Sequence, residues 1–502
     1  MNVLLGISNF LVNQILSVPA FLVGIIVAIG LAALKKNSGQ VLGGALKAIM
    51  GFLILSAGAG VVVTALTPLG TMILGATNAQ GVVPTNEAIV SIAQEQFGGT
   101  TAYVMILGFV ISLILARLTP LKYVFLTGHH VFFMATMLTV VLTTAKVNEA
   151  IVVIVGAVLL GVIMVIMPAF AHPYMKKVTG NNNVAIGHFG TLGYITAGAV
   201  GSAVGKKSKS TEDLKLPQGL NFLRDSMVAT ALSMVLFYAV FSVWYLLKVG
   251  NETAFAVFDP KSPAADTGAY IMKALTNGLQ FGIGVAIILY GVRIILGEIV
   301  PAFQGIAKKF VPGAVPALDC PIVFPYAPNA VLVGFVFSFI GGITSLLLLA
   351  TVFGPAFGLA LILPGMVPHF FTGGAAGVFG NATGGRRGAI LGSFANGVLI
   401  TFLPALLLKV LGSLGFANTT FGDADFGWYG ILIGNGVKAG GVIGIVIVLV
   451  IAIALVALAA VWQTKCVDTG WEPATAHTAF INELKEQEKV AAQAAREAKA
   501  QQ

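Results

Sequence analysis

Long apolar runs separated by short polar stretches dominate the sequence. Runs of about twenty residues, long enough to cross the hydrocarbon core of a bilayer, begin near residues 12, 46, 102, 124, 149, 226, 270, 329, 352, 388 and 437. This pattern predicts an all-α polytopic membrane protein with about eleven transmembrane helices.

Four further stretches are apolar but contain glycine, proline and asparagine, which disfavour a continuous helix. They cover residues 67–100, 181–205, 311–329 and 364–385. Non-helical backbone at membrane depth is tolerated where it is buried in protein or lines a wet cavity. We therefore predict re-entrant hairpins or broken helices around a substrate site at these four places.

Two polar segments divide the chain further. Residues 206–225 read KKSKSTEDLKLPQGLNFLRD, which predicts a connector lying at the membrane interface. After Trp462 the composition changes, and residues 478–500 are rich in Ala, Glu and Lys, which favour a solvated helix. The sequence thus predicts a membrane-embedded domain over residues 1–462 and a charged helical tail over residues 463–502. The tail is too short for a folded catalytic domain.

The composition supports a membrane protein. Hydrophobic residues make up 57% of the chain and charged residues 9%, whereas soluble domains carry about 25% charged residues. The net charge of +9 comes from short clusters between apolar runs, so it predicts no nucleic-acid partner. Cys320 and Cys466 are far apart in the sequence, and they support neither a disulfide framework nor a cysteine metal site.

Basic clusters and acidic loops alternate along the chain and predict its topology. The basic clusters are Lys35–Lys36, Arg117 with Lys122, Lys176–Lys177, Lys206–Lys209, Lys308–Lys309, Arg386–Arg387 and Lys465. The intervening loops carry Glu87, Glu95, Glu252, Asp259, Asp266, Asp423 and Asp425. Because cytoplasmic loops are enriched in Lys and Arg, we expect the N-terminus outside, the C-terminus inside, and the acidic loops on the outer side. The N-terminus lacks the features of a cleaved signal peptide and is expected to be retained.

Ionisable residues within apolar segments are the candidates for function, because each costs roughly 2.5–3.5 kcal/mol at a helix centre. His129 lies in FLTGHHVFF, His188 in IGHFG and Asp319 in ALDCP. Their donors and acceptors suit a polyhydroxyl ligand, which predicts one polar pocket. Hydrogen bonding between helices explains the same residues equally well. On a helix, His130 points about 100° away from His129, so we expect it to pack rather than to line the pocket.

Besides binding a polyhydroxyl ligand, the same side chains could serve two further functions. An ion-coupled secondary carrier would use them as a proton relay, and an intramembrane metalloenzyme would use His129, His188 and Asp319 as metal ligands. The chain contains no HExxH, GxSxG or paired-carboxylate motif. We therefore expect a transporter with no catalytic residue, metal or cofactor of its own.

Long polar motifs between residues 120 and 395 carry a family resemblance. They are FLTGHHVFF, VGKKSKSTEDLKLPQGLNFLRD, GVRIILGEIVPAFQGIAKKFVPGAVPALDCPIVFPYAPNAVLVGF and GVFGNATGGRRGAI. In these motifs the chain resembles the membrane-embedded enzyme IIC component of the bacterial phosphotransferase system, in its ascorbate branch. The resemblance implies an inner-membrane homodimer whose chains each combine a substrate-binding core with a scaffold. It also implies uptake of L-ascorbate or a related sugar acid, coupled to phosphorylation by a separate cytosolic enzyme IIB.

The same resemblance implies a set of substrate-binding residues. The matching positions are Thr85, Asn86, His129, Phe133, His188, Phe189 and Asp319. Three of them depart from the ascorbate members, which carry tyrosine at position 86 and glutamine at positions 133 and 189. The lost amides remove hydrogen-bonding groups, while phenylalanine faces stack on the apolar side of a ring. These departures favour a less hydroxyl-rich ligand, such as another sugar acid, a pentose or a polyol, as the alternative to ascorbate.

Overall fold

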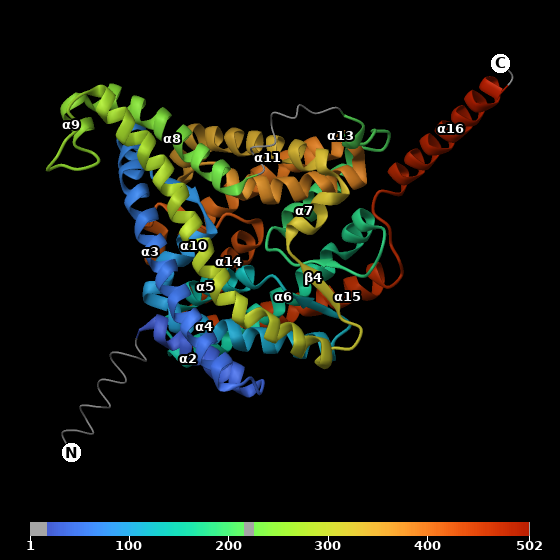
Figure 1. The fold of residues 1–502 in the computed structure, drawn as a ribbon, viewed down its shortest axis with the longest axis horizontal. Coiled ribbons are helices and arrows are strands. Elements are labelled where there is room, and N and C mark those ends of the chain that lie inside the picture. Colours follow the sequence, from blue (N-terminus) through green and yellow to red (C-terminus); the bar gives the residue numbers. More distant parts are fainter. Residues whose placement is uncertain (1–17, 215–224, 501–502) are drawn as a thin grey trace.

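A computed structural model describes residues 18–214 and 225–500, most of which lie in helices (Figure 1). The helices are α2 (Pro19–Ala33), α3 (Ser38–Thr77), α4 (Asn86–Leu118), α5 (Gly128–Thr143), α6 (Glu149–Thr179), α7 (Thr191–Val204), α8 (Ser226–Val249), α9 (Asn251–Phe255), α10 (Thr267–Phe310), α11 (Pro328–Leu348), α12 (Gly354–Phe357), α13 (Met366–Leu407), α14 (Ala424–Val437), α15 (Gly441–Trp462) and α16 (Thr475–Ala500). The strands are β1 (Gly81–Pro84), β2 (Tyr123–Phe125), β3 (Ala185–Ile186), β4 (Val315–Leu318), β5 (Leu361–Ile362) and β6 (Thr419–Thr420).

Eight helices within the described ranges are long and apolar enough to span a bilayer, namely α3, α4, α6, α8, α10, α11, α13 and α15. Shorter apolar helices lie at Val23–Ala32, Gly128–Thr143 and Thr191–Val204. The prediction of an all-α, multi-pass membrane protein is confirmed, while the number of spans stays a prediction. The apolar run near residue 12 lies partly outside the described residues.

One predicted span is wrong. The apolar run near residue 352 does not begin a helix of its own but continues the end of α11 through a π-turn (Leu349–Phe353) into the short α12. Gly358 then ends this helical stretch with φ +62°, a left-handed conformation that glycine adopts without strain. Helix α13 begins only after Pro364 and Gly365.

Helix α13 is a helical hairpin with a sharp break at Gly384 and Gly385. Gly385 has φ 54° and ψ −146°, which a residue with a side chain adopts only under strain. The two arms, 366–383 and 386–407, run antiparallel, and Asn396 Nδ2 donates to Thr372 Oγ1 across them at 3.1 Å. The first arm takes up most of residues 364–385, so the irregular backbone predicted there is confined to Pro364 and Gly365 and to the hairpin turn. The glycines of this arm instead allow close packing against α7 and α11.

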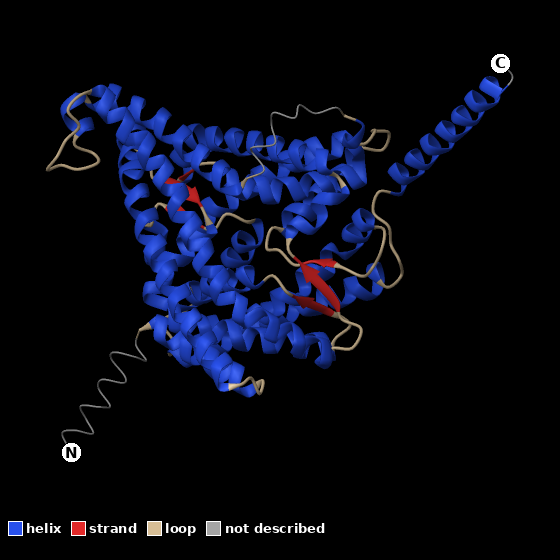
Figure 2. Cartoon of the chain, viewed as in Figure 1, coloured by secondary structure: helices blue, strands red, loops and turns tan. Residues whose placement is uncertain are grey.

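Two small parallel sheets interrupt the helical body (Figure 2). One has the strand order β5-β1-β6 and the other β2-β4-β3. Their registers pair Val82 with Ile362, Val83 with Thr419, Val124 with Pro316, and Ala185 with Ala317. The broken segments 67–100, 181–205 and 311–329 contain β1, β3 and β4, which confirms that the chain is not continuously helical there.

Each strand leads through a short turn into a helix. Helices α4, α5, α7, α13 and α14 begin after β1, β2, β3, β5 and β6, and the 3₁₀ helix Cys320–Tyr326 begins after β4. Because the strands within each sheet are parallel, their carboxyl ends meet at one edge. Sheet pairing therefore gathers helix starts from all along the chain, and α3, α8 and α10 pack on one another beside them (Figure 1).

The C-terminal tail begins with an anchored segment. Helix α15 ends at Trp462, and Trp471 then packs edge-on against Tyr174 of α6. Lys177 Nζ donates to the Glu472 carboxylate and to Thr478 Oγ1, and this bond from Lys177 holds the pKa of Glu472 below its usual range. Helix α16 then projects away from the body (Figure 1). The division between a membrane domain and a tail stays a prediction.

Candidate functional site

A cavity of about 1280 Å³ lies where the strand-to-helix turns face α8 and α10. One wall comes from the six turns, and its polar side chains are Asn86, Glu87, Thr127, His129, His130, His188, Asp319 and Asp423. The facing wall includes Thr230 of α8 and Val285, Tyr290 and Arg293 of α10. Apolar side chains line both sides of the cavity, and the histidines and most of the carboxylates lie on the side of the turns.

The structure brings together the three residues chosen for their chemistry. His129 Nε2 lies 3.6 Å from Asp319 Oδ2, and His188 Nε2 lies 3.9 Å from Asp319 Oδ1. Both distances exceed those of a hydrogen bond. The carboxylate is therefore shared loosely between two imidazoles, and the Asp319 side chain remains 39% exposed. Such an open arrangement leaves hydrogen-bonding capacity for a ligand.

The imidazole of His188 is held in one tautomer by its own loop. The Gly190 N–H donates to His188 Nδ1 at 2.9 Å, and the Tyr194 hydroxyl contacts the same nitrogen at 2.8 Å. A backbone N–H can only donate, so Nδ1 must be the unprotonated nitrogen. Nε2 therefore carries the hydrogen, and it faces Asp319 on the cavity side.

The prediction that His130 stays away from the pocket is wrong. His130 is buried, lines the cavity, and lies with its ring centroid 3.8 Å from that of His188. The Phe189 N–H donates to its Nδ1 at 3.4 Å, so its hydrogen also sits on Nε2. The helical-wheel argument failed because both histidines lie in the first turn of α5, where the cavity wraps around the helix end.

The remaining predicted residues divide into two groups. Asn86 and Phe133 line the cavity. Thr85 is buried, and its backbone N–H donates to Thr420 in the sheet. Phe189 is fully buried, stacked on Phe125 with centroids 4.7 Å apart, and lies behind His130. The cavity lining thus omits Thr85 and Phe189.

Three carboxylates assigned to outer loops lie at the site instead. Glu87 and Asp423 line the cavity, and Asp425 is completely buried. Asn86 Nδ2 donates to Asp423 Oδ2 at 2.8 Å, although these residues are far apart in the sequence. The signal in the sequence was that FGDAD, like ALDCP, places an aspartate directly before a helix, where aspartate is a preferred N-cap residue.

Asp425 fixes the loop that carries His188. Its carboxylate accepts hydrogen bonds from the N–H groups of Thr191 and Leu192 and from Trp428 Nε1, each at 3.0 Å. Its own N–H donates to the Phe189 carbonyl at 2.8 Å. Helix α14 therefore caps the N-terminus of α7 and joins the β6 turn to the His188 turn.

Comparisons of the sequence with known proteins find a matching family and a similar protein. The sequence profile of the family described as PTS system sugar-specific permease component matches residues 14–425. The ascorbate-specific PTS system EIIC component of Mycoplasma pneumoniae (strain ATCC 29342 / M129 / Subtype 1) is 29% identical over 425 residues. This match covers 77% of the chain and 64% of that relative, so the chain spans less than two thirds of the relative's length.

Proposed function

Because the chain belongs to the family of PTS sugar-specific permease components, we propose that it takes up a sugar acid, with L-ascorbate as the first candidate. The similar protein from Mycoplasma pneumoniae is named as ascorbate-specific. The observation that carries the proposal is the cavity in which His129, His188 and Asp319 face one another without direct hydrogen bonds. Their arrangement suits a small ligand that both accepts and donates hydrogen bonds.

An anionic ligand would find favourable groups on both walls. The first turns of α4, α5 and α13 line the cavity, and helix N-termini favour negative charge. Arg293 adds a cation from α10. The Thr127 hydroxyl is buried beside the histidines without a hydrogen-bond partner among the described residues, which makes it a further donor. Asp319 and Asp423 would accept hydrogen bonds from ligand hydroxyls.

The burial of Phe189 bears on the choice between ascorbate and a less polar ligand. Of the two phenylalanines that stand where ascorbate members carry glutamine, only Phe133 lines the cavity. A ligand would therefore meet one changed side chain directly, together with Asn86. This keeps ascorbate as the first candidate, with another sugar acid, a pentose or a polyol as alternatives.

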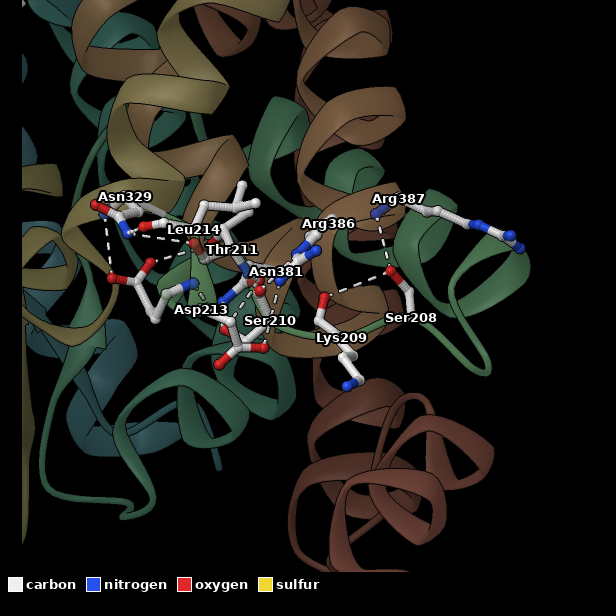
Figure 3. Close-up of polar contacts among 11 residues, drawn as sticks. Ser208, Lys209, Ser210, Thr211, Asp213, Leu214, Asn329, Asn381, Arg386 and Arg387 are labelled. Atoms are coloured by element: carbon white, nitrogen blue, oxygen red, sulfur yellow. Dashed lines mark hydrogen bonds and ion pairs between the residues drawn. The ribbon is translucent and has the colours of Figure 1, made fainter. Parts of the chain in front are cut away.

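The second part of the proposal is phosphorylation by a separate cytosolic enzyme IIB. The loop after α7 would contribute to its docking surface, because it is firmly held against the α13 hairpin (Figure 3). Arg386 Nε donates to the Ser210 carbonyl at 2.9 Å, and Asn381 Oδ1 accepts the Thr211 N–H at 2.9 Å. Figure 3 shows the side chains of Lys209 and Arg387 pointing away from these contacts.

This docking surface consists of Lys206, Lys207, Lys209 and Arg387, whose side chains are exposed. A basic face would attract an acidic, phosphorylated partner. The alternative is that these residues only set topology and bind anionic lipid. Lys308 and Lys309, another of the basic clusters, lie among residues whose side chains are not described. We further propose a homodimer with the N-terminus outside, and with the C-terminal tail 463–502 inside beside this basic face.

Uptake into membrane vesicles containing this protein tests the function. We expect labelled ascorbate to accumulate as its phosphate only when enzymes IIA and IIB and a phosphoryl donor are enclosed. Accumulation of unmodified ascorbate in vesicles that lack enzyme IIB but carry a proton gradient would contradict the proposal. That result would support an ion-coupled carrier that uses the same histidines and carboxylates as a relay.

A further inference from the structure

Asp423 is a buried carboxylate in the cavity with a defined orientation. The Asn86 amide clamps it, because Asn86 Nδ2 donates to Asp423 Oδ2 at 2.8 Å while Asn86 Oδ1 accepts the Gly422 N–H at 2.8 Å. Asp423 is the N-cap residue of α14, yet its side chain makes no capping hydrogen bond. Its Oδ1 therefore has no hydrogen-bond partner among the described residues.

Two imidazoles lie close to this carboxylate. One ring nitrogen of His130, one of His188 and one carboxylate oxygen of Asp423 all lie within 4.8 Å of one another. No hydrogen bond joins Asp423 to either imidazole among the described residues. Two hydrogen bonds of about 2.8 Å that meet at one oxygen at a tetrahedral angle place their outer atoms roughly 4.6 Å apart. Separations of no more than 4.8 Å are therefore short enough for one oxygen atom to reach all three side chains.

The same three side chains resemble a metal site in residue type, but the tautomers exclude one. A metal-bound imidazole nitrogen needs a free lone pair. In both histidines the unprotonated nitrogen is Nδ1, which already accepts a backbone N–H from Gly190 or Phe189. The other nitrogen carries hydrogen, so neither ring offers a lone pair to a cation. A hydroxyl oxygen, which both donates and accepts, satisfies these groups instead.

We propose that Asp423, oriented by Asn86, determines specificity by accepting a hydrogen bond from a ligand hydroxyl, and that its cluster with His130 and His188 binds this hydroxyl rather than a divalent metal ion. The proposal rests on the proposed function in so far as the ligand is a hydroxylated sugar derivative. A ligand that lacks this hydroxyl would leave a buried carboxylate oxygen unpaired, which a site of this kind rejects strongly.

The first test measures binding to the purified full-length protein by calorimetry. The probes are L-ascorbate, other sugar acids, pentoses and polyols, and then singly deoxygenated analogues of the best binder. We expect Asp423→Asn to weaken that binder at least tenfold while the unliganded melting temperature changes little. Asparagine keeps an oxygen for Asn86 but turns an N–H donor toward the ligand. One deoxygenated analogue should lose affinity for wild type and lose nothing further for Asp423→Asn.

This coupling separates ligand recognition from a purely structural role. If every deoxygenated analogue loses the same factor with wild type and with Asp423→Asn, Asp423 does not contact the ligand and the proposal is overturned. Binding of a pentose or polyol without any sugar acid would contradict the proposed substrate. The same comparison of wild type and Asp423→Asn, with the intact and the deoxygenated ligand, would still test Asp423. If no hydroxylated compound binds wild type, both proposals fail.

The second test requires no ligand. Nitrogen-15 NMR of histidine-labelled protein is tractable because the chain has six histidines, and His130→Gln and His188→Gln assign the two signals. We expect unprotonated Nδ1 and protonated Nε2 in both rings, and no change when Zn²⁺ is added. A hydrogen on Nδ1 of His188, or displacement of either signal by Zn²⁺, would refute the assignment of a hydroxyl subsite.

Discussion

Replacing Asp425 by alanine should loosen the His188 loop, because this carboxylate joins α14 to the start of α7. The change removes the acceptor of three donors, the N–H groups of Thr191 and Leu192 and the indole N–H of Trp428. A hydrogen bond to a charged group contributes about 1.5–3 kcal/mol, so the two backbone bonds of Asp425 together contribute roughly 3–6 kcal/mol. The Trp428 side chain is only part-buried, so its bond is expected to contribute less than the two backbone bonds. We therefore expect a loss of about 3–5 kcal/mol.

This loss can be converted into a melting temperature. An unfolding entropy of about 2.1 cal/mol/K per residue, over 502 residues, makes each kcal/mol correspond to about 1 °C. Asp425→Ala should thus melt roughly 3–5 °C lower, measured by gel filtration of the detergent-solubilised protein after heating. Substrate binding should fall by about tenfold or more, because the lost bonds to the N–H groups of Thr191 and Leu192 hold the turn that carries His188.

Matched variants separate the contributions. Trp428→Phe removes one donor and leaves both backbone bonds of Asp425, so it should cost about 1 kcal/mol and leave binding unchanged. Asp425→Asn keeps one acceptor oxygen and should fall between wild type and Asp425→Ala in both assays. If Asp425→Ala keeps the wild-type melting temperature and the wild-type affinity, the carboxylate does not position the His188 loop and the reasoning is refuted.

Further predictions concern the cavity wall, the basic loop and the tail. His129→Ala and Asp319→Ala should each weaken substrate binding about tenfold, or ~1.4 kcal/mol; unchanged affinity in calorimetry would leave them a purely structural role. Phe133→Gln should improve ascorbate binding if ascorbate is the substrate and weaken the preferred ligand if it is not, and a competition assay decides between these outcomes. Replacing Lys206, Lys207 and Lys209 by glutamine should raise the salt-sensitive KM for enzyme IIB without changing substrate affinity. Unchanged phosphorylation kinetics would mean that these lysines only set the topology. Because the pKa of Glu472 is lowered in the folded state, its contribution to tail anchoring is present above its usual pKa of about 4.5 and is lost as the pH falls below that value. Limited proteolysis should therefore cut the tail faster at acidic pH, and Glu472→Gln should remove this pH dependence if the anchor is real.

Local sequence determined the class of this protein. Hydropathy is a property of each segment on its own, so apolar runs predicted helices long enough to span a bilayer without any knowledge of their neighbours. The breaks in 67–100, 181–205 and 311–329 were equally local, since glycine, proline and asparagine disfavour a helix wherever it packs. The high cost of ionisable groups at membrane depth singled out His129, His188 and Asp319, which the structure places around one cavity.

Only the tertiary structure decided the rest of the site. Asn86 and Asp423 meet because β1 pairs with β6, and this pairing joins segments more than three hundred residues apart. No local pattern in the sequence indicates such a pairing, so Asp423 in FGDAD was predicted to be a loop carboxylate. Phe189 packs behind His130, and His130 enters the cavity, because helix ends present several faces to a pocket that wraps around them. Sequence chemistry selected which side chains were costly to bury, and sheet pairing decided which of them face the same ligand.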